Sequence, residues 1–397
     1  MVLISNRRSR VVVASQTRLV LYVLNFLFAL NIALVTYYMS SFIAARGIPK
    51  SMVGLVYALG SLSGALSIIA APFLLKRFGN YTLLIALAIV DAVSYAILGL
   101  SANWWIIAIP FMLKFAVPYM IGFSLDIFLE NSTVSEQGTG GIRAVFITMA
   151  NSAFVLAPAI GGYLITGGDF DLLFLVAASV MLPFVFLAFK RLPYKDNREY
   201  KLPNLKMIRN TITHSKSIRN IFIINFLLRL FYVVMVVYTP IYLHEMIGLN
   251  FSQIGLISSF MLIAFILVEI PLGKIGDAKY GQKEFLIAGF IILSTSTIAV
   301  SLISSASLIL WGILLFTTRV GAAIVDIMNE SFFFKHVDGE DTDKVSAFRT
   351  MSPLAYTIGP AFAVLVLLLL PLQALFAVTG IILLSGAVLA YGLEDTK

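Results

Sequence analysis

The sequence contains no cysteine, which excludes disulfide bonds, thiolate metal sites and cysteine nucleophiles. Charge is also scarce, because only 12% of the residues are charged whereas 60% are hydrophobic. The mean hydropathy of +0.96 lies well outside the range of soluble globular domains. No phosphate-binding loop or dinucleotide fingerprint occurs, and His214, His244 and His336 are not spaced as a metal pair. We therefore expect no metal, no cofactor and no nucleotide-driven enzyme.

Long apolar runs occupy most of the chain. Each is about 20 residues long, the length that crosses a ~30 Å hydrocarbon core. We predict twelve membrane-spanning helices, roughly at 18–43, 50–75, 80–100, 104–128, 143–166, 171–190, 218–243, 251–273, 284–304, 307–330, 346–370 and 372–392. The fold class is therefore all-α and integral to the membrane. The one long polar stretch, 191–217, predicts a cytoplasmic linker between two six-helix bundles at 1–190 and 218–397.

The two predicted bundles repeat each other in sequence. Three features of the first half return in register in the second: residues 25–30 as 225–230, Asp126 with Glu130 as Asp326 with Glu330, and Thr148 with Pro158 as Thr350 with Pro360. So long a period indicates two homologous, pseudo-symmetric halves rather than a short-repeat solenoid. In a hydrophobic chain, two same-sense halves are typical of an alternating-access carrier with its solute site between them.

Basic residues are distributed unevenly between the predicted loops. Nearly all of the 28 Lys and Arg lie in the N-terminus, the even-numbered loops and the C-terminus; the exceptions are Arg46, Lys50, Lys114, Arg229 and Arg319. This asymmetry predicts a multi-pass protein of the plasma membrane with both termini in the cytoplasm. The +8 net charge then reflects topology and contact with anionic lipid rather than nucleic-acid binding.

A glycine-rich motif follows the eighth predicted span and reads GKIGDAKYGQK over residues 273–283. It resembles the loop signature of the major facilitator superfamily, in which a glycine precedes an aspartate, a basic residue, a glycine and another basic residue. With the twelve spans and the repeat, the resemblance covers essentially the whole chain. It implies a secondary transporter in which this loop gates the cytoplasmic side, with gating roles for Gly273, Asp277, Lys279 and Gly281. The first-half counterpart carries Leu75 where the aspartate is expected.

Residues 157–162, APAIGG, resemble the antiporter motif of the same superfamily, although Ala157 stands where a glycine is usual. Proline frees a backbone carbonyl, and small residues let two helices approach closely. The resemblance implies that Pro158, Gly161 and Gly162 favour exchange or export, with simple helix packing as the alternative. The second half retains Gly359 and Pro360 but not the two later glycines.

Charged groups inside the spans are the best indicators of a site, because isolated charges are costly in a bilayer. The resemblance implies that spans 1, 4, 7 and 10 line the cavity, and three cations lie on spans 4, 7 and 10. Asn225, Arg229 and Tyr232 follow an i, i+4, i+7 spacing and so share one helix face. The residues predicted to contact solute are Asn25, Lys114, Asn225, Arg229, Tyr232 and Arg319. The alternative is internal neutralisation, by Asp91 for Lys114, by Asp326 for Arg319, and by an acid such as Asp326 or Asp91 for Arg229.

The acidic residues indicate a gate and a proton site. Two acidic pairs end spans 4 and 10, and two arginines begin spans 5 and 11 as candidate partners. The predicted gate residues are Asp126, Glu130, Arg143, Asp326, Glu330 and Arg349. Glu269 is either associated with the gate or proton-coupled. Asp91 is a further candidate for proton coupling, because removal from water favours the neutral carboxyl group.

Together these observations predict a monomeric secondary active transporter of a small organic solute, which works by alternating access. Proton-coupled antiport or efflux is favoured, with a proton gradient as the energy source. The alternative is uptake or exchange of an organic anion through Lys114, Arg229 and Arg319. A sensor without transport or a membrane-embedded enzyme would need a signalling domain or convergent catalytic groups at one interface, and the sequence offers neither.

Overall fold

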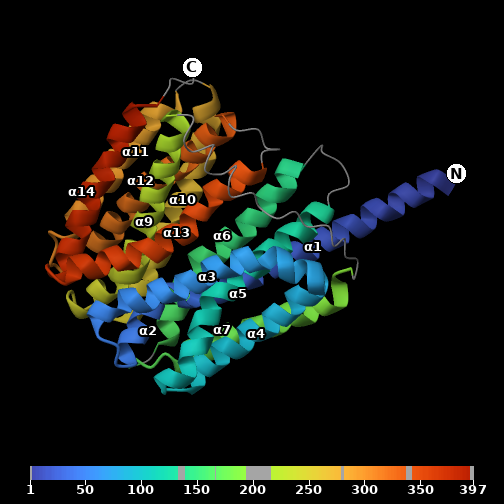
Figure 1. Ribbon diagram of the computed structural model, residues 1–397, viewed down its shortest axis with the longest axis horizontal. Coiled ribbons are helices and arrows are strands. Elements are labelled where there is room, and N and C mark those ends of the chain that lie inside the picture. The colour runs from blue at the N-terminus through green and yellow to red at the C-terminus, as the bar shows by residue number, and fades with distance from the viewer. Residues whose placement is uncertain are drawn as a thin grey trace. The chain divides into compact units, whose positions relative to one another are not determined.

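The computed structural model describes residues 2–132, 139–165, 167–193, 216–278, 281–336 and 342–393. The regular elements within these ranges are all α-helices (Figure 1). Twelve of them are long and apolar enough to cross a membrane. The prediction of an all-helical, twelve-span membrane protein is thereby confirmed.

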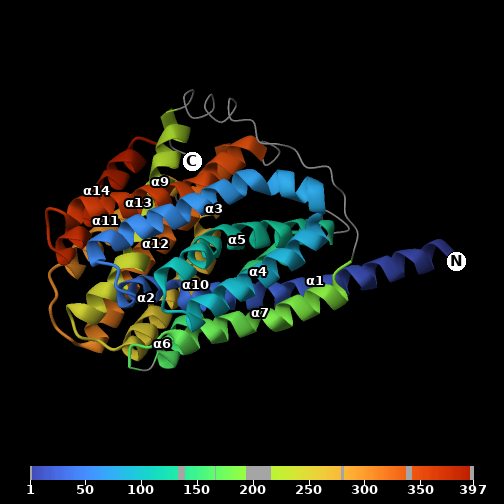
Figure 2. The same cartoon turned by 60° about the horizontal axis from the view of Figure 1, so that its bottom comes forward.

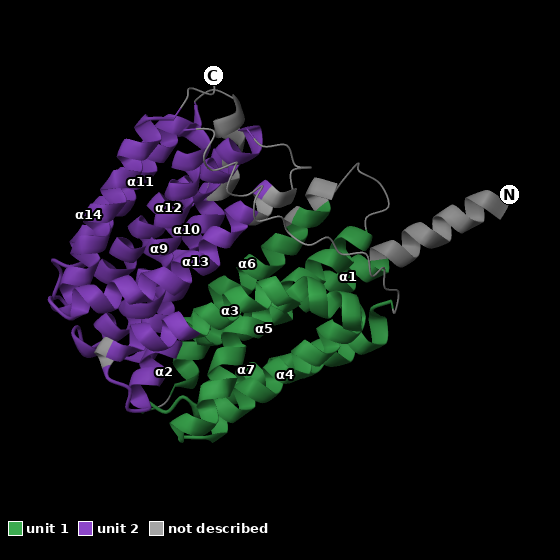
Figure 3. Cartoon of the chain, in the orientation of Figure 1, with its two compact units in different colours: residues 1–38, 60–201 green, residues 39–59, 202–397 purple. Residues whose placement is uncertain are grey.

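The chain divides into two compact units (Figure 3). Unit 1 comprises residues 1–38 and 60–201, and unit 2 comprises residues 39–59 and 202–397. Unit 1 contains α1 (Val2–Thr36), α4 (Asn80–Leu100), α5 (Trp104–Asn131), α6 (Thr139–Leu164), α7 (Asp171–Arg191) and the later part of α3 (Lys50–Phe78). Unit 2 contains the start of α3 with α2 (Met39–Ala45), α9 (Lys216–Glu245), α10 (Phe251–Ala278), α11 (Gln282–Val300), α12 (Leu308–His336), α13 (Thr342–Leu367) and α14 (Leu372–Tyr391).

In unit 1, α1 packs against α6 and α7, and α4 packs against α5 and α7 (Figure 2). Apolar side chains from all five of these helices meet in its core, among them Leu24, Leu84, Ile121 and Met181, each fully buried. Helix α5 begins at a capped turn, because the side chain of Asn103 accepts a hydrogen bond from the backbone N–H of Trp105 at 2.9 Å.

In unit 2, α11 packs against α12 and α14, while α9 packs against α13, α14 and α12. Helix α9 is the most enclosed of the described spanning helices. In its apolar 18-residue stretch 78% is buried, compared with 28–50% in the eleven other spans. A helix that is apolar all round is expected to be surrounded by protein rather than by lipid on one side. Polar side chains of α9 therefore face other helices, and this brings Arg229 to its neighbours.

Candidate functional site

The two repeat-related asparagines make the same contact in their own units. Asn25 Nδ2 donates to the carbonyl oxygen of Phe146 at 2.7 Å, and Asn225 Nδ2 donates to that of Phe348 at 3.0 Å. Both side chains are buried, so each hydrogen bond ties the first helix of its half to the fifth. The predicted contact of these amides with solute stays a prediction, and each already has a structural partner.

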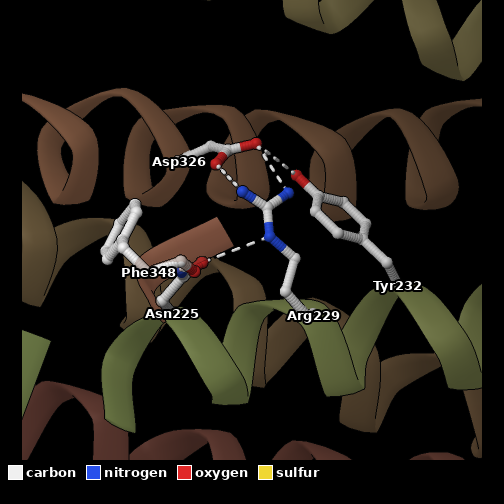
Figure 4. Close-up of polar contacts among 5 residues, drawn as sticks. All are labelled: Asn225, Arg229, Tyr232, Asp326 and Phe348. Carbon is white, nitrogen blue, oxygen red and sulfur yellow. Dashed lines mark hydrogen bonds and ion pairs between the residues drawn. The ribbon is translucent and has the colours of Figure 1, made fainter. Parts of the chain in front are cut away.

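Helix α9 presents Arg229 to Asp326 of α12 (Figure 4). The guanidinium Nη2 lies 2.8 Å from Asp326 Oδ1, and Nη1 lies 3.4 Å from Oδ2. Two parallel donors on one carboxylate form the fork geometry that favours arginine over lysine. The side chains are 21% and 22% exposed, so the pair is partly accessible rather than sealed.

Two further residues of the same α9 face complete this network. Asn225 Oδ1 accepts from Arg229 Nε at 3.2 Å, and the Tyr232 hydroxyl donates to Asp326 Oδ2 at 3.3 Å (Figure 4). The guanidinium of Arg229 also lies 5.6 Å from the centre of the Tyr232 ring. The shared face predicted from the i, i+4, i+7 spacing is therefore confirmed.

The structure selects one of the partners that the sequence offered for Asp326. The candidates were Arg349, Arg319 and Arg229, and the ion pair forms with Arg229. Within the described ranges Asp326 has no ion pair with Arg349, whose side chain is exposed. A sequence signal for this pair did exist, because Ala29 of the first half is replaced by Arg229 while the acid is kept as Asp326.

Arg319 lies two turns before Asp326 on α12 and is only 1% exposed. Its guanidinium stacks over the Phe231 ring at 5.1 Å and the Tyr232 ring at 6.0 Å from the ring centres. Such cation–π contacts partly replace the lost hydration of a buried cation. Its Nη1 atom, however, has no hydrogen-bond partner, and no acid of the described residues forms an ion pair with it. This part of unit 2 thus holds two guanidinium groups for one bound carboxylate.

Unit 1 holds its ionisable groups differently. Lys114 of α5 is buried, with Nζ 4.8 Å from the centre of the Phe115 ring. Asp91 of α4 is fully buried, and neither carboxyl oxygen has a hydrogen-bond partner. The two groups attract each other electrostatically, but the described part of unit 1 shows no direct ion pair between them. Internal neutralisation of Lys114 by Asp91 therefore stays a prediction.

The predicted gate residues fall into two groups. Arg143 lies 3.9 Å from Asp126, so this pairing is confirmed, although the side chains are 39% and 35% exposed. Glu130 and Glu330 are exposed near the ends of α5 and α12, and Gly281 immediately precedes α11. The side chains at Glu269, Gly273, Asp277 and Lys279 lie outside the described part of the structure. All gating roles stay predictions.

The motif residues of α6 pack closely against the end of α1. The Tyr38 hydroxyl donates to the carbonyl oxygen of Pro158. A Cβ atom added at Gly161 would lie 2.6 Å from the Leu34 carbonyl oxygen and 2.8 Å from the Tyr38 ring, so only glycine fits there without a shift. Gly162 is buried on the same helix. The geometry explains the close helix approach, and a role in exchange stays a prediction.

Comparison with known proteins supplies the family. A model of the Major Facilitator Superfamily matches residues 21–348 and 221–397. The chain is 26% identical over 254 residues to "Multidrug resistance protein MdtG" of Citrobacter koseri, covering 60% of this chain and 59% of the relative. It is 25% identical over 283 residues to the protein of the same name in Salmonella choleraesuis, covering 68% and 66%. The chain thus matches slightly less than two thirds of the length of these relatives.

Solved structures show the same fold at low sequence identity. A bacterial homologue of the human lysosomal transporter Spinster superimposes with a TM-score of 0.74 at 12% identity, covering 96% of both chains. A mutant of the nucleoside transporter NupG gives a TM-score of 0.71 at 15% identity, covering 94% of this chain and 98% of the other. At these identities the likeness establishes the fold and carries no information on the solute.

Proposed function

We propose, from the premise that the chain belongs to the Major Facilitator Superfamily, that it is a secondary transporter exporting a small organic solute in exchange for protons. Members of this superfamily are membrane transporters rather than enzymes. In this proposal the chain works by alternating access, as a monomer of the plasma membrane with both termini in the cytoplasm.

The observation that carries the proposal is the polar network between α9 and α12. Ionisable groups within spanning helices are costly, and they are retained where they serve a solute or ion pathway. Arg229, Asp326 and Tyr232 form a connected, partly accessible group, and Arg319 lies beside it with an unpartnered nitrogen. Such a group can bind a polar part of a solute, while the surrounding rings of Phe231 and Phe265 can contact an apolar part.

Export is favoured over import by two weaker observations. The relatives that match are named multidrug resistance proteins, at 25–26% identity. The APAIGG segment of α6 also resembles the antiporter motif of the superfamily and packs closely against α1. Proton exchange is favoured as the energy source because the sequence has no nucleotide-binding motif and places acidic groups within its spans.

The direct test uses purified protein in liposomes that contain a pH indicator and an acidic lumen. Ethidium, a permanently charged aromatic cation, serves as the probe. We expect ethidium to accumulate and its addition to raise the internal pH. An ionophore that has removed the gradient before ethidium is added should abolish both responses. Protein-free liposomes provide the control. Accumulation without any pH response would contradict proton exchange.

A second candidate, uptake or exchange of an organic anion, is favoured specifically by Arg319. Its buried guanidinium has an unpartnered nitrogen, which suits a carboxylate or phosphate group. Carboxyfluorescein is the matching probe, loaded on one side of the same liposomes and exchanged against unlabelled compound. Exchange of carboxyfluorescein without transport of ethidium would favour this candidate over export of a cationic solute.

The proposed orientation has its own test, because the chain has no native cysteine to give background labelling. Ser305→Cys introduces a thiol in the exposed segment before α12, on the side predicted to face outward. We expect an impermeant maleimide to label it in intact cells, whereas a cysteine appended to the C-terminus should react only after permeabilisation. The reverse pattern would contradict the orientation.

A further inference from the structure

Asp91 is a fully buried acid whose carboxyl group makes no hydrogen bond. It lies at the middle of α4, its side chain is fully buried, and neither carboxyl oxygen has a hydrogen-bond partner. A charged carboxylate in such surroundings loses its hydration without compensation, at a cost far greater than that of the neutral acid. The geometry therefore describes a carboxyl group that carries its proton.

The groups around Asp91 are few. Helix α4 packs against α5 and α7. From α5 comes Lys114, whose ammonium lies over the Phe115 ring rather than on the carboxylate. On α4 itself, the hydroxyl of Tyr95, one turn away, is also buried without a partner. Between its terminal residues Asp171 and Lys190, α7 carries no ionisable side chain at all.

This arrangement distinguishes two charge states. With Asp91 protonated, Lys114 is the only charge of the cluster and is held by the ring of Phe115. With Asp91 deprotonated, a buried carboxylate and a buried ammonium would face each other, and a direct ion pair is the state that compensates for both. Loss of the proton should therefore draw Lys114 from Phe115 to Asp91, which changes the contact between α4 and α5.

We infer that Asp91 is the site of the proton that this chain exchanges for its solute, and that Lys114 is the counter-charge of the deprotonated state. The inference rests on the proposed proton-linked transport and gives it a location in unit 1. The proton passes from the carboxyl group to water on one side of the membrane, leaving a carboxylate paired with Lys114. Uptake of a proton from the other side restores the neutral acid and separates the pair.

The position is particular to the first half. At the offset of 200 residues that relates Asp126 to Asp326, the second half carries Ile291 and Leu314 in place of Asp91 and Lys114. Helix packing in the second half therefore does without an ionisable pair at this level. A packing requirement shared by both halves therefore does not explain Asp91. A proton site does, because one such site in the chain is enough for coupling.

The first measurement is infrared spectroscopy of the reconstituted protein during a pH titration. A protonated aspartate gives a carboxylic C=O band that carboxylates lack. We expect such a band in the wild type, falling as the pH rises, and its loss in Asp91→Asn. Asp169→Asn, a change at an exposed aspartate before α7, is the matched control and should keep the band.

Isotope labelling keeps the test independent of the stability of Asp91→Asn. When the wild type is made with ¹³C-carboxyl aspartate, its carboxylic C=O band should shift relative to that of the unlabelled protein. In Asp91→Glu the band should persist unshifted, because the acid is then a glutamate. A wild-type protein without a titrating carboxylic band, or a labelled Asp91→Glu protein whose band still shifts, overturns the inference.

The second measurement links the site to transport in the ethidium liposomes. Asp91→Asn should lose accumulation driven by the pH gradient but keep the exchange of labelled for unlabelled ethidium, since that exchange needs no net proton movement. If Asp91→Asn still accumulates ethidium like the wild type, Asp91 is not the coupling site and the proposed function stands. If the wild type itself does not respond to the gradient, the proposed proton exchange fails and the coupling role of Asp91 fails with it.

Discussion

The two halves of the chain share a frame but differ in where they place charge. Asn25 and Asn225 each donate a hydrogen bond to the equivalent backbone carbonyl oxygen of their own unit, at 2.7 and 3.0 Å. One turn later the first half has Ala29, whereas the second has Arg229. The comparison shows that a repeated helix packing can persist while a single substitution changes the electrostatics of its interior.

The repeated acids show the consequence of that substitution. Asp126 meets Arg143 of the neighbouring α6 at 3.9 Å, and both side chains are more than a third exposed. Its counterpart Asp326 meets Arg229 at 2.8 Å, with both side chains about a fifth exposed. The arginine on α9 thus engages an acid that in the other half remains near the surface. The second half gains a partly buried ion pair, and the first half keeps a fully buried acid at Asp91.

The largest expected effect is at Asp326. Asp326→Asn leaves Arg229 without its counter-charge. The pair is partly buried, so we expect a loss of about 2–3 kcal/mol, between the values for exposed and for fully buried pairs. Asp126→Asn removes a pair that is largely exposed, so we expect a change of about 0–1 kcal/mol. Thermal unfolding in detergent measures both.

A double variant sharpens this comparison. Arg229→Ala combined with Asp326→Asn removes both charges and restores an alanine like Ala29. No uncompensated guanidinium remains, so this double variant should be more stable than Asp326→Asn alone. Equal unfolding temperatures for Asp126→Asn and Asp326→Asn, or no recovery in the double variant, would show that the ion pair does not distinguish the halves.

A smaller effect is expected where α6 meets α1. Gly161→Ala places a Cβ atom 2.6 Å from a backbone oxygen, and overpacking of this kind costs about 1–3 kcal/mol. Gly122→Ala is the matched control in the same unit, because its Cβ would meet only Phe28 at 3.8 Å. Similar thermal unfolding of the two variants would mean that α1 and α6 tolerate separation.

The smallest effect concerns two repeat-related tyrosines. Tyr38 donates to the carbonyl oxygen of Pro158, whereas the buried hydroxyl of Tyr238, near Gly54 within unit 2, has no hydrogen-bond partner. Tyr38→Phe should therefore cost about 1 kcal/mol, and Tyr238→Phe should cost nothing or stabilise slightly. The same unfolding assay decides this, and a larger loss for Tyr238→Phe would reverse the comparison.

The sequence allowed much of the fold to be predicted, because apolar length and the repeat are local or periodic signals. It also predicted that Asn225, Arg229 and Tyr232 share one face, since that follows from helix geometry. It left Asp326 and Asp91 as candidate acids for Arg229, because both lie on other helices and the choice depends on the packing of α9 against α12. The first span also ends earlier than predicted, since α1 stops at Thr36 and α2 begins at Met39.

The burial of Arg319 against Phe231 and Tyr232 could not be predicted for the same reason. Arg319 and Asp326 are two turns apart along α12, and this spacing suggested that they neutralise each other. Tertiary contacts instead give the acid to Arg229 and aromatic rings to Arg319. Which cation of the second half remains available to a solute is therefore visible only in the structure.

The measurement that tests this account most directly compares two changes at the network of unit 2 by the half-saturation concentration for carboxyfluorescein exchange. If Arg319 is the cation free to bind an anionic group, Arg319→Gln should raise that concentration about tenfold or more, since a charge-assisted hydrogen bond contributes about 1.5–3 kcal/mol. The neutral double variant Arg229→Ala with Asp326→Asn should raise it less, because the charges of Arg229 and Asp326 already compensate each other. An unchanged half-saturation concentration in Arg319→Gln, together with a large rise in the double variant, would contradict the account.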